Sequence, residues 1–144
     1  MIVDGKDIYL SVWYDSFTPQ KFLRTLHHEI ITWILRQTWT KDIAERDISM
    51  YNDSSFSYNP TYSSYIDADK SLLKQWFVST YACTTPSNDL SEIAETLMAW
   101  VKLDGVDIRA LDAQEYPILY KKVELVKWYL EPYLTSPFAS TAVV

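Results

Sequence analysis

The sequence has very little cysteine and glycine. Its 144 residues include one cysteine, Cys83, so neither an internal disulfide nor a zinc site built from cysteines is available. Only two glycines are present, which leaves few positions that can adopt a positive φ without strain. We therefore expect a mostly helical chain with simple connections.

Long apolar runs and clusters of basic residues are also missing. No stretch of about 18 or more apolar residues occurs, so we expect no transmembrane helix. The first residues lack the charged and apolar regions of a signal peptide, and none is expected. The net charge of -6 argues against nucleic acid or an anionic membrane surface as the main partner. The residues alone give no cellular location.

What remains is typical of a globular protein. Apolar residues make up 48% of the chain and aromatic residues 15%, which is enough to form a core in a chain of this length. We expect one monomeric domain over residues 1–144, with a frayed tail at residues 135–144.

Periodicity and capping signals predict a mainly α (α+β) domain of about five helices with a short β element near the N-terminus. The predicted strand is 8–14, after an Asp4–Gly5 turn, and the predicted helices are 19–38, 40–50, 68–83, 88–102 and 116–131. The helix at 19–38 is apolar on more than one face, which predicts that it is central and buried. Residues 51–66 are polar and tyrosine-rich, which predicts a long loop whose rings either line a cleft or pack on the core.

One stretch of the helix at 19–38 carries a candidate for chemistry. His28 and Glu29 stand where a zinc hydrolase has the first two residues of His-Glu-x-x-His, but the position four residues after His28 is Thr32. In that motif, histidines four residues apart leave one helix face and bind one metal, and the Glu activates a metal-bound water. A threonine hydroxyl is a poor zinc ligand. Without further context, a polar pair on a core helix explains these residues better than a metal site does.

Four segments in order resemble the zinc-binding metallopeptidases of Bacteroidetes that accompany outer-membrane substrate import, often as lipoproteins. Residues 28–32 align with His-Glu-x-x-His, and residues 76–82 (Trp-Phe-Val-Ser-Thr-Tyr-Ala) with Gly-Phe-Val-Ser-x-Tyr-Ala. Residues 88–92 (Asn-Asp-Leu-Ser-Glu) align with Glu-Asp-Phe-Ala-Glu, and residues 122–129 with a Lys-x-x-x-Val helix. The resemblance spans about residues 5–133 and implies a zincin-like helical domain.

The resemblance also implies roles for individual residues. His28 would be the first zinc ligand, Glu29 the general base and Glu92 the third zinc ligand, as in gluzincins. Asp89 would be a carboxylate that orients a ligating histidine. Without the resemblance, Asp89 and Glu92 are better explained by the preference of a helix N-terminus for acidic residues. The family is exported to the cell envelope.

This chain departs from the family at the implied metal site. Thr32 replaces the second histidine, Trp76 replaces a glycine, and Asn88 and Leu90 replace a Glu and a Phe. Trp76 and Tyr81 are the candidates for the wall of the cleft.

These departures favour a metallopeptidase-like domain that has lost zinc binding and catalysis and acts as a pseudoenzyme, scaffold or binding module for a peptide or protein. The alternatives are an active zinc peptidase with Glu29 as its base, and a helical domain with chance motif matches. The spatial test is whether His28, Thr32 and Glu92 converge on one point.

Overall fold

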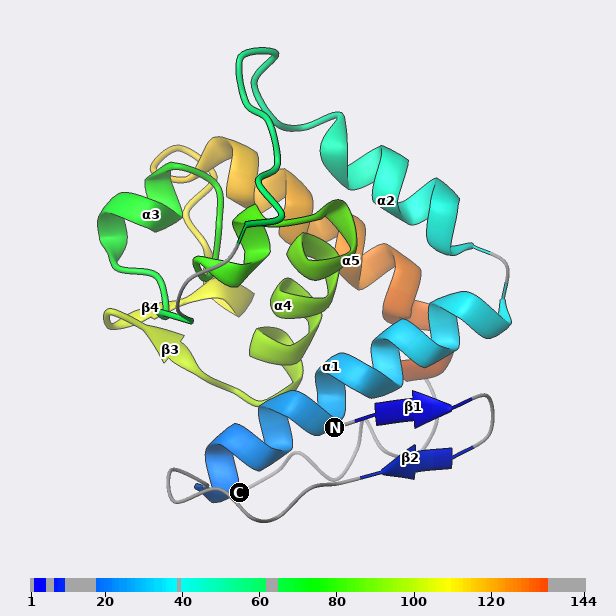
Figure 1. The fold of residues 1–144 in the computed structure, drawn as a ribbon. Helices are drawn as coiled ribbons and strands as arrows, with labels where there is room; N and C mark the ends of the chain where they lie inside the picture. The colour runs from blue at the N-terminus through cyan, green and yellow to red at the C-terminus, as the bar shows by residue number, and fades with distance from the viewer. Residues whose placement is uncertain (1, 5–6, 10–17, 39, 62–64, 135–144) are drawn as a thin grey trace.

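The computed structural model describes residues 2–4, 7–9, 18–38, 40–61 and 65–134. In this part of the chain it is mainly helical, as predicted (Figure 1). Its α-helices are α1 (Pro19–Gln37), α2 (Lys41–Ser49), α3 (Lys70–Lys74), α4 (Pro86–Met98) and α5 (Pro117–Leu134). The short 3-10 helices are η1 (Tyr81–Cys83) and η2 (Ile108–Ala110), and the strands are β1 (Ile2–Asp4), β2 (Asp7–Tyr9), β3 (Lys102–Leu103) and β4 (Val106–Asp107). No described helix has both the length and the apolar character needed to cross a membrane.

The two small β elements are antiparallel hairpins. β1 pairs with β2, and Val3 lies opposite Ile8. The predicted strand at 8–14 begins inside β2, and its residues beyond Tyr9 lie outside the described part of the chain. The second hairpin, β3–β4, turns at Asp104 and Gly105, both of which have positive φ. That backbone suits a tight hairpin, and the Asp-Gly sequence accounts for it.

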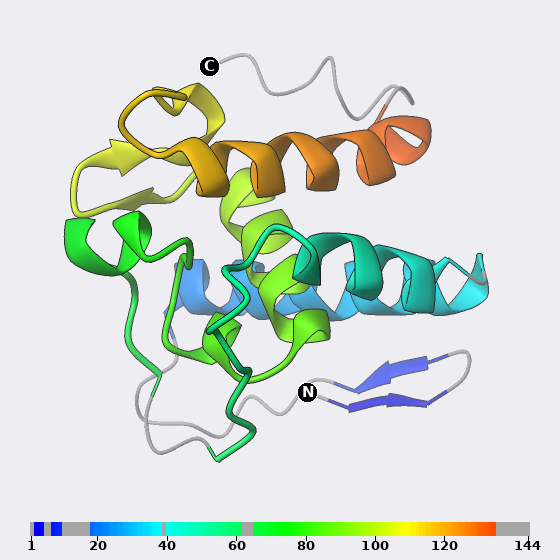
Figure 2. The same cartoon turned by 90° about the horizontal axis from the view of Figure 1, so that it is seen from above.

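The centre of the fold is α4, not α1. All residues from Asp89 to Thr96 are buried, and α4 packs against α1, α2 and α5, as Figures 1 and 2 show. In α1 only Arg24, Ile31 and Leu35 are buried. The prediction that the helix at 19–38 would be central was therefore wrong, because its apolar residues spread over faces that remain partly exposed.

Helix ends follow the local sequence closely. The Thr18 hydroxyl accepts a hydrogen bond from the Lys21 N–H (3.2 Å) and Pro19 occupies the first turn, so α1 begins where predicted. Thr85 caps α4 in the same way through the Asn88 N–H (3.1 Å). This helix begins two residues earlier than predicted, because Pro86 opens the helix instead of ending the segment before it.

The predicted helix at 68–83 is the largest error. Only α3 is α-helical there; Trp76 has a φ of +80°, and Ser79 pairs with Asp67 in an isolated β-bridge. A left-handed residue cannot continue a right-handed helix. The chain therefore leaves α3 at Trp76, passes back along Asp67 and enters η1. This path brings Ser79 beside α4.

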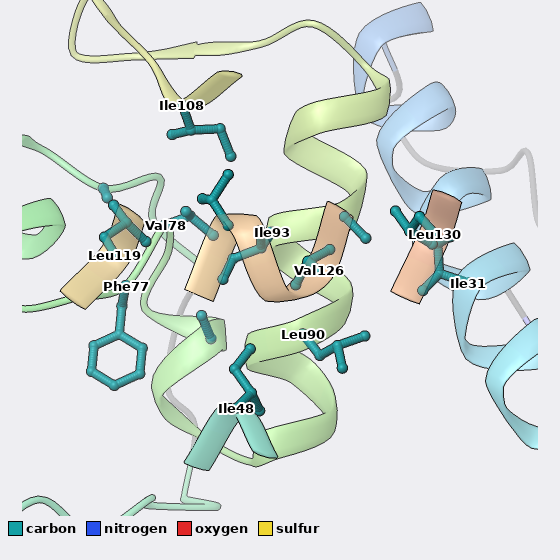
Figure 3. Packing of buried hydrophobic residues seen from close by; sticks show 14 of the residues in the cluster. Ile31, Ile48, Phe77, Val78, Leu90, Ile93, Ile108, Leu119, Val126 and Leu130 are labelled. Carbon is teal, nitrogen blue, oxygen red and sulfur yellow. The ribbon is translucent and has the colours of Figure 1, made fainter. Parts of the chain in front are cut away.

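The hydrophobic core surrounds α4. Leu90 and Ile93 of α4 face side chains from α1, α2 and α5 (Figure 3). Among the partners labelled there are Ile31, Ile48, Leu119, Val126 and Leu130, each no more than about 2% exposed. Burial of side chains of this size stabilises the fold by about 1.5–3 kcal/mol each. The core fixes the angle between α1 and α4, and the candidate site lies between these two helices.

Candidate functional site

One face of α1 forms the floor of a pocket. Lys21, Arg24, Thr25, His28 and Glu29 follow the i, i+3, i+4, i+7, i+8 spacing of a single helix face, and all five line a cavity of about 360 Å³. The other walls come from Tyr65, Tyr81, Glu92 and Glu95. The volume is within the range of small-ligand sites.

Three ionisable side chains meet inside this pocket. The Nδ1 atom of His28 lies 3.2 Å from Oε1 of Glu92 and 3.3 Å from Oε2 of Glu95. The two glutamates are three residues apart on α4, so they leave the same face of that helix. The possible ligand atoms of the three residues all lie within 4.8 Å of one another, and this group could hold a metal ion. We call these three residues the His–Glu–Glu cluster.

Each carboxylate of the cluster is held by a second donor. The Ser79 hydroxyl donates to Oε2 of Glu92 (2.7 Å) and accepts from the Ala82 N–H (3.0 Å). The Arg24 Nε–H donates to Oε1 of Glu95 (2.8 Å). One oxygen of each glutamate therefore faces His28 while the other is occupied, which fixes the orientation of both carboxylates.

Arg24 also ties the pocket wall to α1. Its guanidinium donates to Oδ1 of Asp67 (2.7 Å) and to the Tyr65 hydroxyl, and Tyr65 in turn donates to Asp67 (3.0 Å). Arg24 is only 8% exposed. A buried guanidinium needs such partners, because an uncompensated charge in this position would be very costly.

The electrostatic environment favours a charged cluster. Burial alone lowers the pKa of His28, but its hydrogen bonds to Glu92 and Glu95 outweigh burial and raise that pKa to about 9. Burial raises the pKa of Glu95, and its hydrogen bond to His28 only partly offsets this. Burial lowers the pKa of Arg24, but nearby Tyr65, Glu95 and Asp67 raise it overall. At neutral pH the His28 imidazolium and the neighbouring Arg24 guanidinium therefore face the two carboxyl groups of the cluster.

His28 and Glu92 meet at one point, as the sequence predicted, but Thr32 does not join them. His28 and Glu92 converge, and Glu29 lines the same pocket. Thr32 is used elsewhere: its hydroxyl donates to the backbone carbonyl of His28 (3.0 Å) and lies 3.1 Å from the Ser91 hydroxyl. Thr32 thus links α1 to α4 beside the cluster. The third side chain that could serve as a metal ligand there is Glu95.

Asp89 is not beside a histidine. Its Oδ2 atom accepts from Lys122 Nζ (2.7 Å) and from the Tyr58 hydroxyl (2.8 Å), and both Asp89 and Lys122 are fully buried. The resemblance implied that Asp89 orients a ligating histidine; in the structure its side chain faces Lys122 of α5 and Tyr58 instead. Burial raises the pKa of Asp89 to about 6, with Lys122 opposing the rise. Burial lowers the pKa of Lys122, and Asp89 opposes that shift.

The two predicted cleft residues have different positions. Tyr81 lines the pocket, and its ring centroid lies 6.0 Å from that of His28. Trp76 is not part of the pocket wall; its backbone carbonyl accepts from Lys122 Nζ (3.2 Å). Trp76 therefore supports the buried Asp89–Lys122 ion pair, and only Tyr81 belongs to the site.

Sequence reasoning missed Glu95, Arg24 and the role of Ser79. A signal for Glu95 was available, since Glu92 and Glu95 have the i, i+3 spacing of one helix face. Arg24 lies four residues before His28 and so shares its face of α1. No local signal identified Ser79, because its approach to Glu92 depends on the chain reversal at Trp76.

Comparison with protein-family models, with curated proteins and with solved structures finds no match to this chain.

Proposed function

We propose that this chain is a metallopeptidase-like domain without catalysis, whose pocket binds a peptide. The observation that carries the proposal is that both carboxylates of the His–Glu–Glu cluster already face positive groups. Glu92 and Glu95 face two positive groups that belong to the protein itself, His28 and Arg24. Both buried carboxylates thus already have a positive partner from the protein, with Arg24 shared between Glu95 and the part-exposed Asp67. An added divalent cation would have to replace part of that arrangement.

Replacing these contacts with a metal ion would lower the metal affinity of the site. A metal needs the neutral imidazole, and the pKa of about 9 for His28 implies a loss of about a hundredfold in apparent metal affinity at pH 7. Arg24 would also stay next to one ligand and repel the cation. The motif position that would supply a further nitrogen, Thr32, has its hydroxyl bonded between α1 and α4. These three features together favour a site that binds metal weakly.

The pocket itself supports the peptide-binding part of the proposal. It has polar groups on the α1 floor and the tyrosine rings of Tyr65 and Tyr81 in its walls. Tyrosine contributes both apolar contact area and a hydrogen-bonding hydroxyl, a combination common at peptide-binding surfaces. An extended peptide offers both kinds of partner along its length.

A second candidate, a zinc-dependent peptidase, is favoured by Glu95. The distances of 3.2 and 3.3 Å from His28 Nδ1 to the two carboxylate oxygens are close to the ligand–ligand separation of a tetrahedral zinc site, about 3.3–3.6 Å for bonds of about 2.0–2.2 Å. His28, Glu92 and Glu95 would hold the metal, which would activate a water when bound. Glu29 lines the same pocket and would accept the proton of that water.

Metal content and hydrolysis distinguish the two candidates. The protein would be purified without a histidine tag, incubated with zinc, dialysed and analysed by plasma mass spectrometry, then incubated with a quenched fluorescent peptide library. We expect no retained zinc and no hydrolysis. Retention of one zinc per chain, together with hydrolysis that Glu29→Gln abolishes and the exposed Glu131→Gln control preserves, would establish the peptidase instead.

A further inference from the structure

The pocket carries one uncompensated charge at each end of its floor. Lys21 and Glu29 both line the cavity, and neither side chain forms an ion pair or hydrogen bond in the part of the chain that the structure describes. The acidic groups between them are different, since Glu92 and Glu95 are compensated by His28 and Arg24. Any ligand in this pocket therefore meets a free cation at one end and a free carboxylate at the other.

The separation of these two charges is set by α1. Lys21 and Glu29 are eight residues apart, which corresponds to about 12 Å along the helix axis. An extended peptide spans about 3.3–3.6 Å per residue. A peptide of about three or four residues thus matches the distance between the two side chains, and the flexible lysine accommodates the difference between these lengths.

The surroundings of Lys21 favour a negative group of the ligand, and those of Glu29 favour a positive group. Lys21 lies in the first turn of α1, where the helix dipole favours a negative group. Glu29 lies near the compensated cluster, where no further free cation competes for it in the described residues. A ligand with a carboxylate at the Lys21 end and an ammonium at the Glu29 end satisfies both positions.

We infer that the pocket recognises a short peptide of three or four residues with both ends free, its C-terminal carboxylate at Lys21 and its N-terminal ammonium at Glu29. This inference rests on the proposed function and adds the class of ligand. Tyr65 and Tyr81 then contact the side chains of the peptide, and the buried cluster forms the polar floor beneath its middle. Recognition of both ends would select products of proteolysis over internal segments of folded proteins.

Trialanine in four forms tests the inference directly. The peptides are free at both ends, N-acetylated, C-amidated, and blocked at both ends, and each is titrated into the full ¹⁵N-labelled chain while the amide signals of Thr25 and His28 are followed. We expect the free form to bind most tightly, and each block to raise Kd about tenfold or more, because each removes a charge-assisted hydrogen bond.

Variants assign each end of the peptide to one side chain. In Lys21→Gln we expect amidation to lose its effect while acetylation keeps it, and in Glu29→Gln we expect the reverse. Lys70→Gln and Glu131→Gln remove exposed charges outside the pocket and should leave all four Kd values unchanged. This pattern cannot arise from a general loss of folding, since each variant keeps its response to one of the two blocks.

The outcomes separate this inference from the proposed function. If all four peptides bind equally well, recognition of the ends is overturned while peptide binding stands. If no peptide shifts any amide signal, both are overturned. Cleavage of trialanine, detected by mass spectrometry in the same samples, would overturn the absence of catalysis and leave recognition of the ends intact, provided that the effects of the blocks are seen.

Discussion

His28 and Glu95 make a contact between two helices: Nδ1 of the histidine lies 3.3 Å from Oε2 of the glutamate. Glu95 is one helical turn beyond Glu92 and approaches the imidazole from α4 rather than from α1. The site consequently depends on the packing of two helices, whereas a His-Glu-x-x-His pair would lie on one.

The two histidines should titrate at very different pH. The pKa of His28 is raised to about 9, whereas burial lowers the pKa of His27 below its usual value of 6.5. Imidazole signals followed by NMR should show one group titrating near pH 9 and the other below pH 6.5. Two titrations near pH 6.5 would contradict the charged state proposed for the cluster.

The same shift predicts how stability depends on pH. Because the folded-state pKa of His28 lies above its unfolded value, its contribution is fully present below about pH 6.5 and is lost as pH rises through about 9. The contribution is roughly 3 kcal/mol at most. Urea unfolding at a series of pH values should show stability falling across this range, and His28→Gln should remove the slope. His27→Gln, the control, should retain it.

Trp76 should be one of the few sites where glycine is better than alanine. A φ of +80° costs residues with a Cβ about 1 kcal/mol or more relative to glycine. Both Trp76→Gly and Trp76→Ala lose the packing of the ring, so their difference isolates the backbone effect. We expect Trp76→Gly to be more stable than Trp76→Ala by about 1 kcal/mol in urea unfolding.

The matched control for Trp76 is Trp128, an exposed residue within α5. There the order should reverse, with alanine more stable than glycine by about 0.8–1.0 kcal/mol, as in other helix interiors. The same order at both tryptophans would show that Trp76 carries no backbone strain.

The sequence predicted the helices whose signals are local and failed where the chain reverses. Thr18 and Pro19 sufficed to place the start of α1, and Asp104–Gly105 to place a turn. No signal in residues 68–83 predicted the left-handed conformation of Trp76, because residues with large side chains disfavour it. The helical spacing of apolar residues continues past Trp76, and the predicted helix was therefore extended to residue 83.

The candidate site could also be predicted only in part. His28 and Glu92 were identified from motif segments, and they do meet. Arg24 and Ser79 were missed because their partners are set by tertiary packing, across 71 and 13 residues of sequence respectively. Thr32 could be recognised as a departure from the motif, but not as a link to Ser91.

Zinc binding should be gained by adding a second histidine to α1. Thr32→His combined with Ser91→Ala removes the hydroxyl pair between α1 and α4 and places a second imidazole four residues after His28. We expect this variant to retain about one zinc per chain after dialysis. Thr38→His, a histidine at the far end of α1, should retain none. No gain in this variant would contradict the view that the missing nitrogen ligand limits zinc binding at the cluster.

Removal of Lys122 should be far more damaging than removal of an exposed lysine. Its Nζ lies 2.7 Å from Asp89, and both side chains are fully buried. Lys122→Met leaves a buried carboxylate without its counter-charge and should cost about 3–5 kcal/mol of stability. Urea unfolding measures the loss, and Asp89→Asn in the same chain should restore part of it.

The control for Lys122 is the exposed pair of Lys127 and Glu124 on the same helix. Lys127→Met should cost less than about 1 kcal/mol, as is usual for surface pairs. Equal losses at the two lysines, or no recovery in the Lys122→Met/Asp89→Asn chain, would show that the buried charges are not coupled.

The pairing of Asp89 with Lys122 has a consequence for the order in which the protein is assembled during translation. The lysine follows the aspartate by 33 residues, which takes about 2–7 s at about 5–20 residues per second. Until α5 emerges from the ribosome, burying the central helix would leave the Asp89 carboxylate without its counter-charge, which is costly. We therefore expect the core around α4 to close only when α5 arrives.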